Sequence, residues 1–373
     1  MMNDISDNNK SINETEKPNN QKKLIKRIGV VLFAVFCGAA VLITALKEFG
    51  PASTAERVPI SSINLNYLLL ALAAFVLAMA AESAKYYFMI FDVTGGKKLP
   101  WLAYKVAIYG KYYDNITPFG SGGQPFQIYH LQKTGIPLGD AAALPIAGFT
   151  SSQIAFVILA LTMFIANGGV TKMVGFRIAA YAGLLFYLFV PLTLILFAIF
   201  PNGTSRMIEF VIKIGWKIKI VKNVSKTVDK IKSTLIEYRA GMVRILSKKK
   251  TFARVLLLSF IYQIGILSIP FFVIIAFGGS VNWFDVFTMT LLVYASVTVV
   301  PTPGNAGAAE GAFYTLFQTL SQANLFWAML VWRFFVFYLV IIVGFATSSY
   351  EKIKSNLSKR DGKAAKQTSK EKK

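Results

Sequence analysis

Long apolar stretches alternate along the chain with shorter polar or basic segments. An α-helix needs about 20 predominantly apolar residues to cross the hydrocarbon core of a bilayer. Stretches of about this length are expected to be membrane-spanning helices: 28–46, 65–91, 141–166, 177–200, 253–277 and 325–349. The pattern therefore predicts an all-α polytopic membrane protein with about six full spans.

The composition supports this interpretation, because 55% of the 373 residues are hydrophobic and only 16% are charged. A water-soluble fold cannot easily bury so much apolar side chain, which argues against a soluble enzyme and against a disordered protein. The single cysteine, Cys37, and the single histidine, His130, exclude an internal disulfide and a Cys- or multi-His metal cluster. No cofactor or metal is expected.

Positive charge is concentrated in three segments, which fixes the expected sidedness. Residues 1–27, 201–254 and 350–373 carry +2, +11 and +6, together 19 of the 22 net positive charges. Short Lys/Arg-rich segments stay in the cytoplasm, so both termini are expected there, in a protein of the cell membrane. Attraction to the anionic inner leaflet accounts for these residues, and no direct nucleic-acid partner is expected.

The chain is expected to divide into three regions: a disordered cytosolic N-terminus (1–24), a transmembrane domain (25–350) and a basic cytosolic tail (351–373). We interpret the first span as a retained signal anchor. The basic insert at 203–252 has apolar residues at spacings of three and four. It is expected to form an amphipathic helix, lying either on the cytoplasmic membrane surface or against the inner face of the protein.

Two segments, 101–137 and 284–322, are too polar for a lipid-facing span and too apolar for an aqueous loop. Six crossings satisfy the charge distribution only if each segment enters and leaves the membrane on one side. We therefore expect two re-entrant or broken-helix hairpins. Because non-helical backbone at membrane depth is tolerated only inside protein or around a wet cavity, the hairpins predict such a cavity.

Each of these segments contains a Thr-Pro pair followed at once by a glycine-dense turn, at 115–125 and at 301–311. Thr117 lies 52 residues after the start of one span and Thr302 lies 49 residues after the start of another. The first of these spans is expected to run inward and the second outward. The same order of elements in opposite orientations predicts an inverted repeat, with a binding site near the membrane midplane.

Proline and glycine explain why such a break suits ligand binding. Proline ends a helix and frees backbone carbonyls, while glycine lets a ligand or another backbone approach closely. A half-helix that starts after the break directs unpaired N–H groups and the positive end of its dipole at the break. Two such ends facing one cavity predict an anion site suited to a lipid phosphate.

The residues 109–118 (YGKYYDNITP), 122–125 (GGQP) and 301–307 (PTPGNAG), with Glu310, resemble the membrane region of lysylphosphatidylglycerol synthases. The resemblance covers about residues 25–350. It implies a flippase that moves an aminoacylated phospholipid, such as lysylphosphatidylglycerol, between leaflets and contributes to resistance to cationic antimicrobial peptides. In bifunctional members a separate cytosolic domain performs the synthesis. Since only 24 residues follow the last span, the chain is not expected to be an enzyme by itself.

Charged side chains at membrane depth are costly and are candidates for function. Glu82 and Lys85 are close enough on one span to pair, and Arg333, within an apolar run, is expected to pair with Glu310. We hypothesise that Lys111 and Arg333 bind a lipid phosphate and that Asp114 and Glu310 meet a cationic head group. The predicted substrate-binding residues are Lys111, Asp114, Asn115, Thr117, Pro118, Gly122, Gly123, Gln124, Thr302, Pro303, Gly304, Asn305, Gly307, Glu310 and Arg333.

Two other functions compete with lipid transport at this stage. The first is a membrane-embedded transferase, for example a phosphatidylglycerol lysyltransferase, for which Asp114, His130 and Glu310 are the available acid–base groups. The second is a non-catalytic membrane partner of a separate synthase. The chain contains no GxxxxGK[ST] sequence, which argues against ATP as the direct driver of transport. Membrane phospholipid is the expected partner, and the oligomeric state is left open.

Overall fold

The computed structural model describes residues 63–199, 236, 239–245, 247–321 and 324–354. Over these residues the fold is all-helical, without strands, as the sequence predicts. The expected disordered N-terminus, the first span at 28–46, most of the insert at 203–252 and nearly all of the basic tail lie outside the described residues.

Five helices are long and apolar enough to cross a membrane. They are α2 (Leu65–Val93), α5 (Leu138–Asn167), α6 (Val174–Ile199), α9 (Lys249–Ala276) and a helix over Leu325–Lys354. The last begins as α12 (Leu325–Arg333) and continues through one turn of π-helix, η5 (Phe334–Tyr338). These helices confirm the five predicted spans that fall within the described residues. The boundaries differ slightly: α9 begins inside the predicted insert, and the last helix extends to Lys354.

Between these long helices lie two pairs of short helices, each pair joined by a 3-10 turn. The first pair is α3 (Pro100–Ile116) and α4 (Gly123–Lys133), joined by η2 (Pro118–Gly120). The second is α10 (Trp283–Val297) and α11 (Ala308–Phe317), joined by η4 (Pro303–Asn305). None exceeds 17 residues, or about 26 Å, which is shorter than the hydrocarbon core. Because the members of each pair pack against one another, each pair is a broken-helix hairpin.

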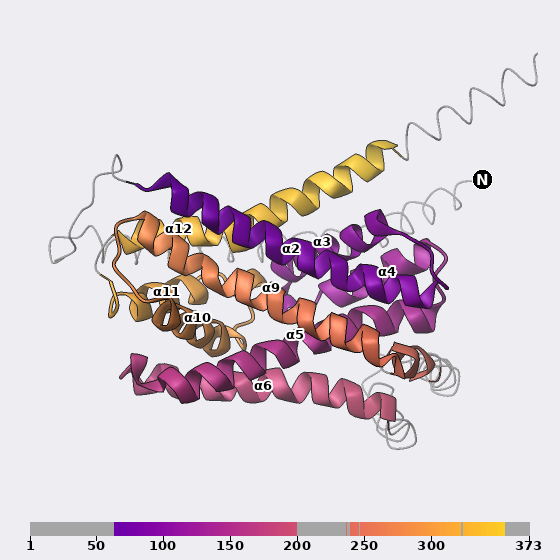
Figure 1. Ribbon diagram of the computed structural model, residues 1–373, viewed down its shortest axis with the longest axis horizontal. Coiled ribbons are helices and arrows are strands. Elements are labelled where there is room, and N and C mark those ends of the chain that lie inside the picture. Colours follow the sequence, from indigo (N-terminus) through magenta and orange to yellow (C-terminus); the bar gives the residue numbers. More distant parts are fainter. Residues whose placement is uncertain (1–62, 200–235, 237–238, 246, 322–323, 355–373) are drawn as a thin grey trace, which may run out of the picture.

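The two hairpins approach each other from opposite ends of the molecule. Helices α2 and α9 run antiparallel along their lengths: Asn64 N donates to Ala276 O (3.0 Å) at one end, and Lys248 Nζ lies 3.2 Å from Asp92 Oδ1 at the other. The chain leaves α2 at one end of this pair to form α3 and α4, and leaves α9 at the opposite end to form α10 and α11 (Figure 1). The two turns, η2 and η4, are in contact.

The backbone of the two turns is the same at corresponding positions. Phe119 and Gly304 both have φ +57°, and the residues that follow, Gly120 and Asn305, have φ +58° and +52°. Each turn also carries the same pair of backbone hydrogen bonds, donated by the third and fourth residues after the threonine position. Together with the order of the surrounding helices, this agreement supports the inverted repeat that the sequence predicts.

Apolar side chains fill the interior and also cover much of the outside. Trp332, Phe287 and Phe313 are fully buried where α10, α11 and α12 meet. On the outer faces of α2 and α6, large apolar residues such as Leu69 (62% exposed) and Phe189 (66% exposed) point away from the protein. Apolar surface on both sides of the same helices is what a bilayer environment requires.

Candidate functional site

Where the two hairpin turns meet, two hollows of about 240 and 570 Å³ share several lining residues. We treat them as one cavity and call the smaller hollow its narrow part and the larger its wide part. Polar side chains from the first hairpin line both parts: Lys111, Asp114, Asn115 and Gln124. Groups from α2 and α9 line only the narrow part: Glu82, Tyr86, Tyr262 and Gln263. Residues of both turns and of α12 line the wide part: Phe119, Gly120, Ser121, Gly304, Asn305 and Arg333.

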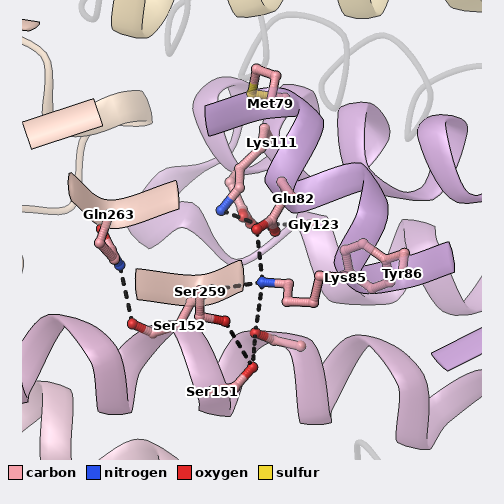
Figure 2. Close-up of polar contacts among 12 residues, drawn as sticks. Met79, Glu82, Lys85, Tyr86, Lys111, Gly123, Ser151, Ser152, Ser259 and Gln263 are labelled. Atoms are coloured by element: carbon pink, nitrogen blue, oxygen red, sulfur yellow. Dashed lines mark hydrogen bonds and ion pairs between the residues drawn. The ribbon is translucent and has the colours of Figure 1, made fainter. Parts of the chain in front are cut away.

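A buried ionic cluster lies beside the narrow part (Figure 2). Glu82 and Lys85 are one turn apart on α2 and pair at 2.7 Å, which confirms the pair expected from the sequence. Lys85 also donates to Ser152 Oγ (2.7 Å) and to the carbonyl oxygen of Gly148 (3.1 Å) on α5. Together with Glu82, these contacts give the ammonium group three partners, and they join α2 to α5.

Lys111 completes the cluster from α3 and is held more loosely. Its Nζ lies 3.5 Å from Glu82 Oε1, longer than the 2.7–2.9 Å typical of charge-assisted hydrogen bonds, and 4.3 Å from the centre of the Tyr262 ring. The Lys111 side chain is 26% exposed, whereas Glu82 is 4% exposed. The ammonium of Lys111 therefore faces the cavity with a long ion pair on one side and an aromatic face on the other.

The first break is stabilised by side chains that bond its own backbone. Asp114 accepts from Gly123 N (2.9 Å) at the start of α4. Thr117 accepts from Gly122 N (2.8 Å) and donates to the carbonyl of Tyr113 (2.7 Å). These bonds satisfy N–H groups that the start of a helix leaves unpaired. The predicted picture of free N–H groups aimed into the cavity is therefore only partly correct, because two of them already bond to protein side chains.

The second break is held by the predicted Arg333–Glu310 pair, which the structure confirms at 2.7 Å. Both side chains are buried, with 5% and 7% exposed. Arg333 also donates to the carbonyl of Gly304 (3.1 Å) in η4, and the second oxygen of Glu310 accepts from Gly307 N (2.7 Å). One guanidinium thus connects α12 to both the turn and the start of α11.

The fifteen predicted site residues fall into two groups. Seven line the cavity: Lys111, Asp114, Asn115, Gln124, Gly304, Asn305 and Arg333. The other eight shape the two breaks and are not among the lining residues of its two parts: Thr117, Pro118, Gly122, Gly123, Thr302, Pro303, Gly307 and Glu310. Most of the proline and glycine residues of the breaks therefore shape the cavity through the backbone conformation and do not line it.

The three acid–base groups considered for a transferase, Asp114, His130 and Glu310, each contact a different set of residues. Glu310 is engaged by Arg333 and Gly307, and Asp114 by Gly123. His130 on α4 stacks edge-on against Tyr109, with ring centres 5.1 Å apart. Neither His130 nor Glu310 is among the residues lining the cavity.

Sequence reasoning missed most of the neutral polar lining of the narrow part. Five of the missed tyrosine and glutamine side chains come from spans, Tyr86, Gln153, Tyr187, Tyr262 and Gln263, and two from the hairpins, Gln127 and Tyr294. Their signal in the sequence is an uncharged polar residue inside a mainly apolar stretch. That signal is weak, because tyrosine is also common at membrane surfaces.

The comparisons with known proteins agree with these features. The family model described as the lysylphosphatidylglycerol synthase TM region matches residues 28–344, which include both breaks, the ionic cluster and Arg333. Among curated proteins, none matches the chain.

Proposed function

The chain belongs to the family of the lysylphosphatidylglycerol synthase transmembrane region, and from this premise we propose that it moves phospholipid head groups between the two leaflets. The observation that carries the proposal is the meeting of two helix breaks, from opposite ends of the molecule, around one cavity. A site between inverted repeats can be opened to either side of the membrane by rocking one repeat against the other.

The cavity has polar groups and also reaches apolar side chains at its edge, as a phospholipid has a polar head group and apolar acyl chains. Charged and amide groups line both parts, and only the wide part also reaches Phe119 and Phe186, which are 59% and 45% exposed. At membrane depth, an exposed aromatic side chain meets acyl chains. The head group enters the narrow part while the acyl chains remain in the hydrocarbon outside.

The proposed cargo is an aminoacylated phospholipid, the class that includes lysylphosphatidylglycerol, with a role in resistance to cationic antimicrobial peptides. Lys111 and Arg333 are the proposed contacts for the phosphate, and Asp114 for the cationic group, whereas Glu310, which does not line the cavity, pairs with Arg333. A cation near the lipid phosphate and a carboxylate near the ammonium are the pairings that a low-dielectric site favours. The region 25–350 is the proposed transport domain.

Blocking the cavity is expected to stop transport. Asn115 lines both parts, so Asn115→Trp fills space where the head group would pass. In proteoliposomes with acyl-labelled aminoacyl phospholipid, a leaflet-sidedness assay is expected to show translocation reduced about tenfold or more, toward the protein-free rate. The matched control is Tyr129→Trp on the outer face of α4, where the side chain is 61% exposed. Equal rates for Asn115→Trp and the unmodified protein would contradict the proposal.

We further propose that the end of the molecule where α2 meets α3 faces the cytoplasm, in the cell membrane. Lys98 lies in an exposed turn at that end, and Ser280 in an exposed turn at the opposite end. In a Cys37→Ser background, Lys98→Cys is expected to react with an impermeant maleimide only after the cells are opened, whereas Ser280→Cys reacts in intact cells. The reverse pattern would overturn the proposed orientation, which rests on the distribution of positive charge.

A further inference from the structure

The charged groups of the cavity balance one another. Those that line it are Glu82, Lys111, Asp114 and Arg333, and two of these have buried partners, Lys85 and Glu310. Three cations and three carboxylates give a formal sum of zero. A net charge in a low-dielectric cavity is strongly unfavourable, and the protein's own charged groups balance one another there.

Within this balanced set, Lys111 is the cation best placed to change partners. Lys85 is fully buried with its donors satisfied, and Arg333 bonds Glu310 and the Gly304 carbonyl. Lys111 instead has a 3.5 Å contact to Glu82 and the face of Tyr262, and its four-carbon stem can move the ammonium within the cavity.

Moving Lys111 would leave Glu82 with Lys85 alone and would uncover the Tyr262 ring. A carboxylate beside an aromatic face attracts an ammonium group. Asp114, which lines both parts of the cavity, adds a second carboxylate three residues along α3 from Lys111. The site that a departing Lys111 vacates is therefore a site for one ammonium.

From this charge balance we infer that the preferred cargo is a head group of net charge zero, with one phosphodiester and one ammonium. Its phosphate takes Lys111, and its ammonium takes the place of Lys111 between Glu82 and Tyr262. One internal ion pair is exchanged for two ion pairs with the ligand, and the cavity stays neutral. The inference rests on the proposed function and narrows its cargo.

Head groups of the other classes would either leave the cavity with a net charge or form no ion pair with it. An anionic phosphatidylglycerol would bring a net negative charge, and a lysyl ester, with two ammonium groups and one phosphate, a net positive charge. An uncharged glycolipid would leave the Lys111–Glu82 pair intact and gain no ion pair. The predicted order therefore places an ester of a monoamino acid, or phosphatidylethanolamine, above all three.

Competition between lipids tests this order directly. The full-length protein in detergent is mixed with equal amounts of phosphatidylglycerol, its alanyl ester, its lysyl ester and a neutral glycolipid, and bound lipid is counted by native mass spectrometry. The alanyl ester is expected to exceed each of the others about tenfold, because phosphatidylglycerol and the lysyl ester leave one unit of charge unbalanced and the glycolipid gains no ion pair. Equal binding of the alanyl ester and the glycolipid would overturn the inference.

Two variants then change the net charge of the cavity in opposite directions. Lys111→Gln makes the cavity net negative and is expected to move the preference to the lysyl ester. Asp114→Asn makes it net positive and is expected to move the preference to phosphatidylglycerol. Lys98→Gln, which removes the same charge from an exposed turn, is expected to leave the order unchanged.

The outcomes separate this inference from the proposed function. If the variants bind and translocate lipid with an unchanged order of preference, the charge-balance inference fails and the transport proposal stands. If neither the variants nor the unmodified protein moves any lipid of the panel, both fail. Thermal unfolding of each variant shows whether a loss of binding comes from loss of the fold.

Discussion

Replacing Arg333 by methionine is expected to lower the free energy of unfolding by about 3–5 kcal/mol, because Glu310 would be left buried without its cation. The loss of stability is larger still because the guanidinium also donates a hydrogen bond to the Gly304 carbonyl in η4. Glu310→Gln is expected to have an effect of similar size, since it removes the charge that Arg333 needs and weakens the bond to Gly307 at the start of α11. Chemical denaturation in a mild detergent measures both.

The double variant shows whether the effect belongs to the pair. Arg333→Met with Glu310→Gln removes both charges, so its cost is expected to be well below the sum of the two single costs. Glu351→Gln is the matched control, because it also removes one carboxylate from an ion pair, with Lys105, but this carboxylate is 31% exposed. Its expected cost is about 1 kcal/mol or less. If Arg333→Met unfolds no more easily than Glu351→Gln, the proposed support of the second break is wrong.

Replacing Gly304 by alanine is expected to destabilise the protein by about 2–3 kcal/mol and to reduce translocation. A Cβ atom at this position would lie 2.2 Å from Cε2 of Phe337, and the backbone has φ +57°, which costs an L-residue about 1–2 kcal/mol. The turn would have to move away from Phe337 on η5, and the Arg333 contact to the Gly304 carbonyl would be lost with it. Unfolding in detergent and the leaflet-sidedness assay measure the two effects.

The first hairpin supplies the control for this prediction. Phe119 occupies the corresponding position with the same φ of +57°, and its side chain points outward, 59% exposed. The backbone conformation alone therefore tolerates a side chain, and the contact with Phe337 adds to its cost at Gly304. Phe119→Gly is expected to leave stability unchanged or higher. The double variant Gly304→Ala with Phe337→Ala is expected to cost less than the sum of the two single variants, because the two side chains no longer meet. An unchanged Gly304→Ala variant would rule out close contact between η4 and η5.

The turns of the two halves of the repeat have the same backbone conformation but different side-chain contacts. Both turns have the same left-handed pair of residues. Each break is bonded by a carboxylate of its own hairpin, Asp114 or Glu310, and only the second is also held by Arg333 from a neighbouring helix. The ionic cluster around Glu82 also belongs to the first half alone. The cavity is therefore asymmetric: the ionic cluster lies on the side of the first half, and Arg333 is the charged residue on the side of η4 and α12.

The sequence by itself determined the long helices of the described residues, the two breaks and two buried ion pairs, Glu82–Lys85 and Arg333–Glu310. Apolar length sets the spans, because a bilayer imposes a minimum thickness, and Thr-Pro-Gly patterns interrupt a helix whatever surrounds them. Charge alone predicted that Arg333 pairs with Glu310, because an isolated charge inside an apolar run is too costly to leave unpaired.

Only the tertiary structure decided which polar residues face the cavity. A membrane helix is apolar on both its lipid-facing and its protein-facing side, so its hydrophobic pattern does not reveal which side packs inward. Residues such as Tyr262 and Gln263 became part of the site only when α9 packed against α2. Most of the predicted glycines and prolines shape the backbone around the site and do not line it, and the charged and polar side chains of the site come mainly from α2, α3, α9 and α12.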